Sequence, residues 1–218
     1  MRLSAAIIAG GHSRRMGRDK ALLPDRDHGT LLQRQIELLR RVAPVEILVS
    51  CRPEQTLSLP ADVRRVHDAG THGPLAGLAT ALSSVHGADL LLVIGVDLGR
   101  LDEGFLRRLL DASSPDRGCV PRTPAGPEPL AAAYPTSLAA EAAARLARGT
   151  DLSLRGFVQA GINAGRLRWL EVQDADAACL ANWNEPADLP ARPDRDGSRE
   201  TARLGEHRTT QKGPPSPR

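Results

Sequence analysis

Residues 8–20 read Ile-Ala-Gly-Gly-His-Ser-Arg-Arg-Met-Gly-Arg-Asp-Lys, and this stretch decides the fold class. It continues a short apolar run that begins at residue 5 and predicts a buried strand. Its three glycines let the backbone approach a ligand closely, and successive backbone N–H groups form an anion-binding concavity. Arg14, Arg15 and Lys20 add positive charge to the same small volume. The stretch therefore predicts a strand that runs into a phosphate-binding loop.

The spacing of Gly10, Gly11 and Gly17 excludes two common phosphate-loop motifs. The Walker A motif places its lysine directly after a glycine and follows it with Ser or Thr, whereas Arg18 and Asp19 intervene here. The dinucleotide fingerprint G-x-G-x-x-G does not fit either. A plain Gly-Gly turn flanked by solvated arginines is the alternative. The strand, the paired glycines, the basic cluster and the lysine together favour phosphate binding.

Composition indicates one α/β domain followed by a tail. The chain has 218 residues and only 2% aromatic residues, so its core must be built from Leu, Val, Ile and Ala. The net charge of +3 comes from residues 191–218, which hold 7 Lys or Arg and 4 Asp or Glu. Residues 1–190 are therefore neutral, and charge gives no reason to expect nucleic-acid binding. We expect one folded domain at 1–190 and a disordered basic tail at 191–218.

Cysteine usage and hydropathy narrow the cellular setting. Cys51, Cys119 and Cys179 are widely spaced and odd in number, which suggests neither a zinc site nor a disulfide framework. No apolar run reaches transmembrane length. We expect a cytoplasmic protein that does not bind membranes.

Strand and helix patterns alternate along the chain, which predicts a mostly parallel sheet covered on both faces. The fold class expected is a single Rossmann-like three-layer α/β domain. The predicted strands are 4–9, 45–50, 63–67, 89–96, 119–121, 130–134 and 167–172, and the predicted helices are 31–42, 74–84, 102–110, 137–147 and 152–160.

Asp97 directly follows the most apolar predicted strand, residues 89–96. Open α/β sheets bind ligands at the carboxyl ends of their strands. A carboxylate there can hold Mg²⁺, which takes one or two carboxylates together with substrate phosphate oxygens. An aspartate that caps the next turn is the alternative. Together with the phosphate loop, Asp97 predicts a metal site.

The glycine-rich stretch resembles A-G-G-x-S-x-R-M-G-x-D-K, the signature of nucleotidyltransferases that act on sugars and cofactors. Every fixed position of the signature is present: Ala9, Gly10, Gly11, Ser13, Arg15, Met16, Gly17, Asp19 and Lys20. The resemblance implies the nucleotide-diphospho-sugar transferase type of fold. It also implies that the segment from Ile8 onward wraps the triphosphate of a nucleotide and that Lys20 contacts the phosphates.

A second motif, Gly73-Pro74-Leu75-Ala76-Gly77 preceded by Asp68, is similar to one in the molybdenum cofactor guanylyltransferases. The resemblance implies that Asp68, Gly73 and Gly77 belong to the nucleotide site, although a plain helix start explains the glycines equally simply. That family often has asparagine after its second strand. Cys51 stands there in this chain, which implies altered base recognition because a thiol cannot replace a carboxamide.

Further resemblances concern the acceptor side of the site. Asn182-Trp183-Asn184-Glu185-Pro186 resembles the family's N-x-N-x-P, which implies that Asn182 or Asn184 lies beside the metal and the acceptor. An asparagine-closed turn is the alternative. Residues 128–135 resemble a strand next to the acceptor pocket, and Arg155 matches an arginine near the acceptor's anionic groups, unless it is an ordinary surface arginine. Residues 95–99 depart from the family's C-D-x-P around Asp97, which puts the substrate-side contacts there in doubt.

Together these resemblances imply transfer of GMP from GTP to the terminal phosphate of Mo-molybdopterin, with release of pyrophosphate. Lys20, Arg15 and Asp97 are the expected catalytic residues, with Mg²⁺ on Asp97. Alternatives are CTP with molybdopterin, GTP with another phosphorylated acceptor, or a non-catalytic nucleotide-binding domain. Expected partners are GTP and molybdopterin as substrates, and molybdoenzymes or other cofactor-biosynthesis proteins; we expect a monomer.

Overall fold

The structure is a computed structural model that describes residues 1–10, 19–25, 27–68, 73–149 and 151–183. The predictions made for Gly11, Ser13, Arg15, Gly17 and Asn184 lie outside these residues, as does the expected tail. Within the described ranges, no helix is both long enough and apolar enough to cross a membrane.

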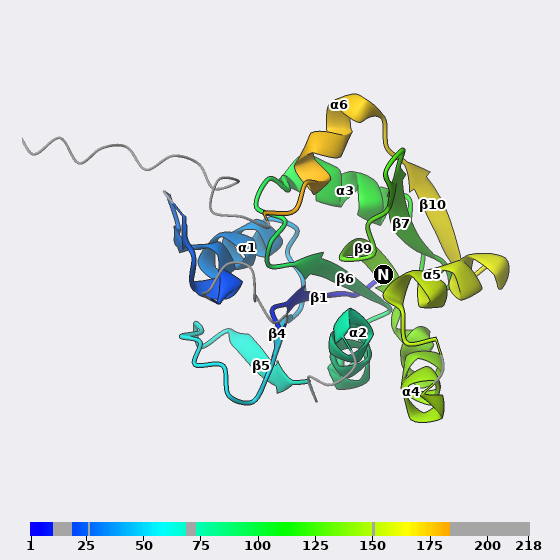
Figure 1. Ribbon diagram of the computed structural model, residues 1–218, viewed down its shortest axis with the longest axis horizontal. Coiled ribbons are helices and arrows are strands. Elements are labelled where there is room, and N and C mark those ends of the chain that lie inside the picture. Colours follow the sequence, from blue (N-terminus) through cyan, green and yellow to red (C-terminus); the bar gives the residue numbers. More distant parts are fainter. Residues whose placement is uncertain (11–18, 26, 69–72, 150, 184–218) are drawn as a thin grey trace, which may run out of the picture.

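A twisted, mostly parallel sheet forms the middle layer (Figure 1). Its strands follow the order β10-β7-β9-β6-β1-β4-β5, and short β8 pairs with β7. Strand β9 runs antiparallel to both of its neighbours, and the other long strands run parallel to one another. The bounds are β1 Leu3–Ile8, β4 Ile47–Cys51, β5 Val63–His67, β6 Leu90–Gly95, β7 Gly118–Thr123, β8 Gly126–Pro127, β9 Ala131–Pro135 and β10 Leu167–Glu171; β2 (Pro24–Asp25) and β3 (Gly29–Thr30) form a separate two-stranded ribbon.

Helices cover both faces of the sheet, as the alternating pattern predicted (Figure 1). Helices α1, α3 and α6 lie on one face, and α2, α4 and α5 lie on the other. The bounds are α1 Leu31–Arg40, α2 Gly73–Ser84, α3 Glu103–Asp111, α4 Ala139–Arg148, α5 Leu154–Asn163 and α6 Asp174–Ala177, with short 3-10 helices η1 Lys20–Leu22, η2 Thr136–Leu138 and η3 Ala178–Leu180. The expected three-layer α/β domain is confirmed.

Side-chain caps fix where several helices begin. The hydroxyl of Thr30 accepts a hydrogen bond from the backbone N–H of Gln33, so α1 begins where the sequence predicted. Asp102 caps α3 and Ser153 caps α5 in the same way. Helix α4 ends at Gly149, whose φ of 67° is a left-handed conformation that glycine adopts without strain.

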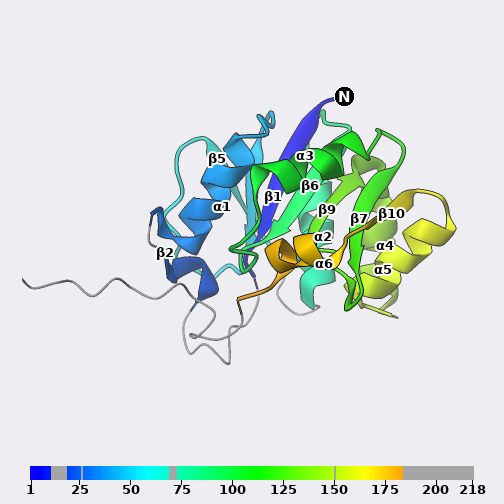
Figure 2. The same ribbon diagram turned by 90° about the horizontal axis from the view of Figure 1, so that it is seen from above.

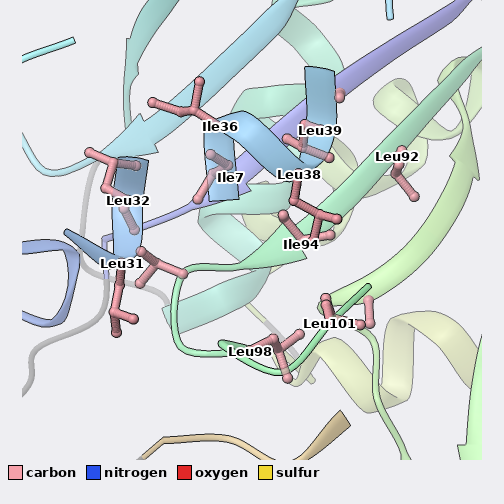
Figure 3. Close-up of a cluster of buried hydrophobic side chains, with 14 of the residues drawn as sticks. Ile7, Leu31, Leu32, Ile36, Leu38, Leu39, Leu92, Ile94, Leu98 and Leu101 are labelled. Atoms are coloured by element: carbon pink, nitrogen blue, oxygen red, sulfur yellow. The ribbon is translucent and has the colours of Figure 1, made fainter. Parts of the chain in front are cut away.

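The core forms one hydrophobic cluster on each side of the sheet. Strand β6 is buried along its whole length, and β1 along all but its first residue, as expected for central strands of a parallel sheet. Figure 3 shows the cluster under α1, where leucines of the helix meet Ile7 of β1 and Ile94 of β6. Leu98 and Leu101, from the segment after β6, extend this cluster toward the end of the sheet. The segment that carries Asp97 is therefore anchored in the core.

The strand order reverses between β1 and β6, which defines a topological switch point. Ile8, the last residue of β1, is in register with Gly95, the last residue of β6. The backbone N–H of Val96 donates to the carbonyl of Ile8 at 3.2 Å. The segments that follow these two strands therefore leave the sheet side by side. Figure 2 shows the N-terminus at the start of β1, away from this edge, with α6 lying closer to it.

Candidate active site

A lysine and a carboxylate meet at the switch point. Lys20 is the first residue of η1, and its Nζ lies 2.8 Å from Oδ2 of Asp97 in the segment after β6. The two side chains are 16% and 22% exposed, so both remain within reach of a ligand from solvent. The structure thus brings together, from opposite sides of the switch point, two of the three residues predicted as catalytic; the third, Arg15, lies outside the described residues.

The turn that carries Asp97 is held by two residues from distant parts of the chain. Gln35 of α1 is fully buried, and its Nε2 donates to the carbonyl of Leu98 at 2.9 Å. The backbone N–H of Trp183 donates to the carbonyl of Asp97 at 2.9 Å, and the indole ring packs against Gly99. A Cβ at Gly99 would lie 2.4 Å from the Trp183 ring, so only glycine lets the ring approach so closely. These contacts fix the backbone on which the carboxylate sits.

Hydrogen bonds also fix both described ends of the glycine-rich segment. The carboxylate of Asp19 accepts a hydrogen bond from Ala21 N at 3.0 Å, which caps η1 and sets the position of Lys20. Gln55, in the connection between β4 and β5, donates both to Asp19 and to the carbonyl of Ala9. Arg52 donates to the carbonyl of Gly10 at 2.7 Å. Sequence reasoning did not find Gln55 or Arg52.

Besides the Lys20–Asp97 pair, the site contains a polar niche around Asp68. Asp68 follows β5 and is only 4% exposed, with its carboxylate between Gly10 and Gly77. A Cβ at Gly10 would lie 2.4 Å from Oδ2 of Asp68, so glycine is needed for this packing. The Ser50 hydroxyl lies 3.5 Å from Oδ2, at the limit of a hydrogen bond, while Oδ1 is buried with no hydrogen-bond partner among the described residues. Because an unpaired buried carboxylate oxygen is costly, this niche is suited to a ligand that donates hydrogen bonds.

The structure places Asp68, Gly10 and Gly77 together, as the sequence analysis expected of the nucleotide site, and Gly73 begins α2 with a φ of 65°. Cys51 is different. Its thiol is fully buried in the hydrophobic cluster under α1, and this burial raises its pKa. Alternate residues of a strand face opposite sides of the sheet, so Ser50, not Cys51, presents its side chain to Asp68. Cys51 is the last residue of β4, and its thiol faces the cluster under α1, although the charges of Asp68 and Asp19 are near enough to add to the rise in its pKa.

A carboxyl and a carboxamide lie on the far side of Asp97. Glu128 precedes β9, and its Oε2 accepts a hydrogen bond from Nδ2 of Asn182 at 3.3 Å. Burial raises the pKa of the Glu128 carboxyl, and the charge of Asp97 acts in the same direction. Arg155 on α5 is exposed and close enough to Glu128 for its charge to oppose this rise. Asn182, Glu128 and Arg155 thus border Asp97 on the side expected to hold the acceptor.

The donor atoms around Asp97 fit a hard divalent cation that also binds substrate. Among the described residues, no group of three or more His, Cys, Asp or Glu side chains could form a metal cage. Mg²⁺ does not require such a cage, because it takes one or two carboxylates and completes its shell with water and phosphate oxygens. Asp97 offers the carboxylate. Asn182 donates to Glu128 and directly precedes Trp183, whose backbone N–H donates to the carbonyl of Asp97.

Some residues of the site carried a signal that sequence reasoning did not use. Gln35 lies four residues after Leu31 and three after Leu32, so helical periodicity places this polar side chain on the buried face of α1. A polar residue on a buried face must find a hydrogen-bond partner, which here is the turn after Asp97. Gln55 carried no such signal because it lies outside any regular element.

The fold and the pair at its switch point define a nucleotidyltransferase type of α/β domain, and comparison with known proteins agrees. Residues 5–164 match the family described as MobA-like NTP transferase domain. The chain is 37% identical over 188 residues to a probable molybdenum cofactor guanylyltransferase of Opitutus terrae, a match that covers 85% of this chain and 92% of that protein. The chain belongs to the MobA-like NTP transferase family.

Solved structures share the fold at lower identity. Molybdopterin-guanine dinucleotide biosynthesis protein A of Archaeoglobus fulgidus superposes with a TM-score of 0.61 at 23% identity, covering 85% of this chain and 94% of that one. A Mycobacterium tuberculosis protein solved in complex with manganese superposes with a TM-score of 0.58 at 22% identity, covering 87% of this chain and 93% of that one.

Proposed function

We propose that this protein is a molybdenum cofactor guanylyltransferase, which transfers GMP from GTP to the terminal phosphate of molybdopterin and releases pyrophosphate. The observation that carries the proposal is the contact between Lys20 and Asp97 across the switch point. It sets a cation for the nucleotide phosphates beside a carboxylate suited to a divalent cation. The name of the Opitutus terrae relative, whose match covers most of both chains, supports the same reaction.

Guanine is the proposed base because of the niche around Asp68. Oδ1 of this carboxylate is buried and has no hydrogen-bond partner in the part of the chain that the structure describes, which favours a ligand that donates hydrogen bonds. The Watson–Crick edge of guanine offers two adjacent donors, N1–H and the N2 amino group, which match the two oxygens of one carboxylate. The corresponding edge of cytosine offers only its N4 amino group as a donor. The niche therefore supports GTP over CTP.

The proposed reaction needs positioning and charge neutralisation more than proton transfer. The acceptor phosphate is ionised at neutral pH, so its oxygen attacks the α-phosphorus in line while the bond to the bridging oxygen of pyrophosphate breaks. Lys20 and Arg15 offset the charge on the β- and γ-phosphates as pyrophosphate leaves. The backbone of the glycine-rich segment from Ile8 to Gly17, including Ser13, binds the triphosphate.

The residues around Asp97 are proposed to hold the metal and orient the acceptor. Mg²⁺ would be held by Asp97, with Asn182 or Asn184, and would supply Lewis-acid stabilisation of charge on the α-phosphate. The manganese complex of the Mycobacterium tuberculosis protein supports a divalent cation at this type of fold. Arg155, beside Glu128, is available for an anionic group of the acceptor.

Pyrophosphate release in the presence of Mg²⁺ and Mo-molybdopterin tests the proposal, with GTP, CTP and ATP compared side by side. Release with GTP alone is the expected result. Release with CTP alone would move the protein to cytidylyl transfer and contradict the role given to Asp68. Tight GTP binding without release would point to a different phosphorylated acceptor or to a non-catalytic nucleotide-binding domain.

A further inference from the structure

The buried side chain of Gln55 connects the two ends of the glycine-rich segment. Its Nε2 donates to the carbonyl of Ala9 at 3.0 Å and to Oδ2 of Asp19 at 2.7 Å. Its Oε1 accepts from the backbone N–H of Arg52 at 2.8 Å, which fixes the orientation of the amide. Both amide hydrogens and the oxygen are therefore used, although the residue is only 4% exposed. One side chain thus joins residues that lie ten positions apart in the chain.

Arg52 adds a second contact at the first of these ends. Its Nη1 donates to the carbonyl of Gly10 at 2.7 Å, while its Nε pairs with Glu54 at 2.8 Å. The guanidinium is well covered, with 14% of the side chain exposed. The start of the β4–β5 connection, residues 52–55, therefore holds the backbone at Ala9 and Gly10 and the carboxylate of Asp19.

The contact between Gln55 and Asp19 affects the position of Lys20. The other oxygen of the Asp19 carboxylate caps η1, whose first residue is Lys20. Lys20 in turn contacts Asp97. A displacement of Asp19 would therefore move the ammonium that neutralises phosphate charge. Buried polar networks of this kind rigidify a site only when every member is satisfied, as is the Gln55 amide here.

We propose that Gln55, assisted by Arg52, is a positioning residue for nucleotide binding. Gln55 clamps the entry and exit of the phosphate loop to the β4–β5 connection, and through Asp19 it sets the position of Lys20. This inference rests on the proposed function only for the identity of the nucleotide. The hydrogen bonds of the clamp join residues of this chain to one another.

Two substitutions at Gln55 distinguish the effect of its hydrogen bonds from the effect of its packing volume. Gln55→Glu keeps the size and the acceptor for Arg52 N–H, but loses both donations and sets a negative charge beside Asp19. Gln55→Met keeps the volume and removes all three hydrogen bonds. Arg52→Met removes the guanidinium contacts with Gly10 and Glu54, keeps the backbone N–H that donates to Gln55, and serves if the buried substitutions impair folding. Thr56→Ala, at an exposed position of the same connection, is the matched control.

Three measurements are made on each variant: the unfolding midpoint, the Kd for GTP with Mg²⁺ by calorimetry, and hydrogen–deuterium exchange without nucleotide. We expect both Gln55 variants to weaken GTP binding by about 10-fold or more, as misplaced binding groups do. Exchange should rise at the hydrogen-bonded amides of Ala9 and Leu22, and stay unchanged in β5. Thr56→Ala should match the parent protein in all three measurements.

The inference is overturned if folded Gln55 variants show parental exchange at Ala9 and Leu22. It is also overturned if exchange rises equally throughout β5, since that pattern means general destabilisation. The outcomes remain distinct from those of the proposed function. Failure of the parent protein to bind GTP contradicts the proposed function, whereas the exchange pattern tests the clamp without any nucleotide.

Discussion

Nζ of Lys20 lies 2.8 Å from Oδ2 of Asp97, although 77 positions separate the two residues in the chain. One residue follows β1 and the other follows β6, so the contact spans the switch point of the sheet. Both side chains are partly exposed, so the pair is accessible from solvent. The proposed function gives the ammonium a role toward phosphate and the carboxylate a role toward a divalent cation.

Lys20→Ala should reduce the kcat for pyrophosphate release by about 100- to 1,000-fold, because charge on the leaving pyrophosphate loses its preorganised cation. Folding should survive, since a partly exposed ion pair contributes only about 1 kcal/mol or less. Steady-state kinetics and a thermal unfolding curve check both points. Lys20→Arg should recover only part of the activity. Near-parental kcat in Lys20→Ala would remove this lysine from the mechanism.

Asp68→Asn should weaken GTP binding by about 10- to 100-fold without lowering the unfolding midpoint. The substitution removes one acceptor from the guanine edge, and a hydrogen bond to a charged group contributes about 1.5–3 kcal/mol. It also removes a buried charge whose Oδ1 has no partner among the described residues, which favours the folded state.

Calorimetry with GTP and with CTP, together with thermal unfolding, measures both effects. Asp62→Asn is the matched control, because Asp62 is exposed and pairs with Arg40 away from the niche. Unchanged GTP affinity in Asp68→Asn would show that this carboxylate does not read the base.

The sequence predicted the layers of this fold well because its signals are local. The Thr30 cap and the apolar run of β6 lie within a few residues of the elements they define. The direction of β9 could not be predicted in this way. Its Ala131–Ala133 run reads equally well in either direction, and its antiparallel pairing with β6 is a property of the whole chain path.

In the candidate site, too, residues in a local sequence motif were predicted and residues outside one were missed. Lys20 and Asp97 were recognised because each sits in a motif directly after a strand, and the sheet brings such ends together. Gln35 and Gln55 were missed because they act through hydrogen bonds to segments 36 or more positions away. Cys51 was expected near the nucleotide from a family resemblance, as the counterpart of an asparagine after the second strand. Strand alternation turns its thiol toward the cluster under α1, and its role at the nucleotide stays a prediction.

Gly99→Ala should both destabilise the protein and lower its kcat. The added Cβ would lie 2.4–2.6 Å from atoms of the Trp183 ring, and overpacking of this kind costs about 1–3 kcal/mol. Because Trp183 N–H donates to the carbonyl of Asp97, a displaced Trp183 also shifts the turn that carries the carboxylate.

Urea unfolding and steady-state kinetics test this coupling. Gly104→Ala, in α3, is the control. Among the described residues outside the helix backbone, its Cβ would meet only Asp102 Oδ1, at 3.3 Å, and alanine favours the helix. If Gly99→Ala lost stability but kept its kcat, Trp183 would have no part in positioning Asp97.

Glu46→Gln should lower stability at neutral pH and leave the kcat unchanged. Glu46 lies just before β4, at the amino-terminal end of the strand, whereas Lys20 and Asp97 lie beyond the carboxyl ends of β1 and β6. Its carboxylate accepts hydrogen bonds from Arg64, Ser4 and the backbone N–H of His86. Burial alone would raise the pKa of its carboxyl, but these hydrogen bonds outweigh burial and hold the pKa below the ordinary 4.5. A carboxyl whose pKa is lowered by folding stabilises the folded state above its unfolded pKa and loses that contribution as pH falls through its folded value.

The difference in the free energy of unfolding between Glu46→Gln and the parent protein should therefore be about 1 kcal/mol at pH 7, and it should shrink as the pH falls below 4.5. Urea unfolding across that pH range measures it. Glu37→Gln provides the comparison, since the Glu37 side chain is 56% exposed and pairs only with Arg40 of the same helix among the described residues. A difference that grew toward acid pH would mean that the protonated form of Glu46, not its carboxylate, is the one that these hydrogen bonds favour, and a fall in kcat would mean that this end of the sheet is coupled to the site.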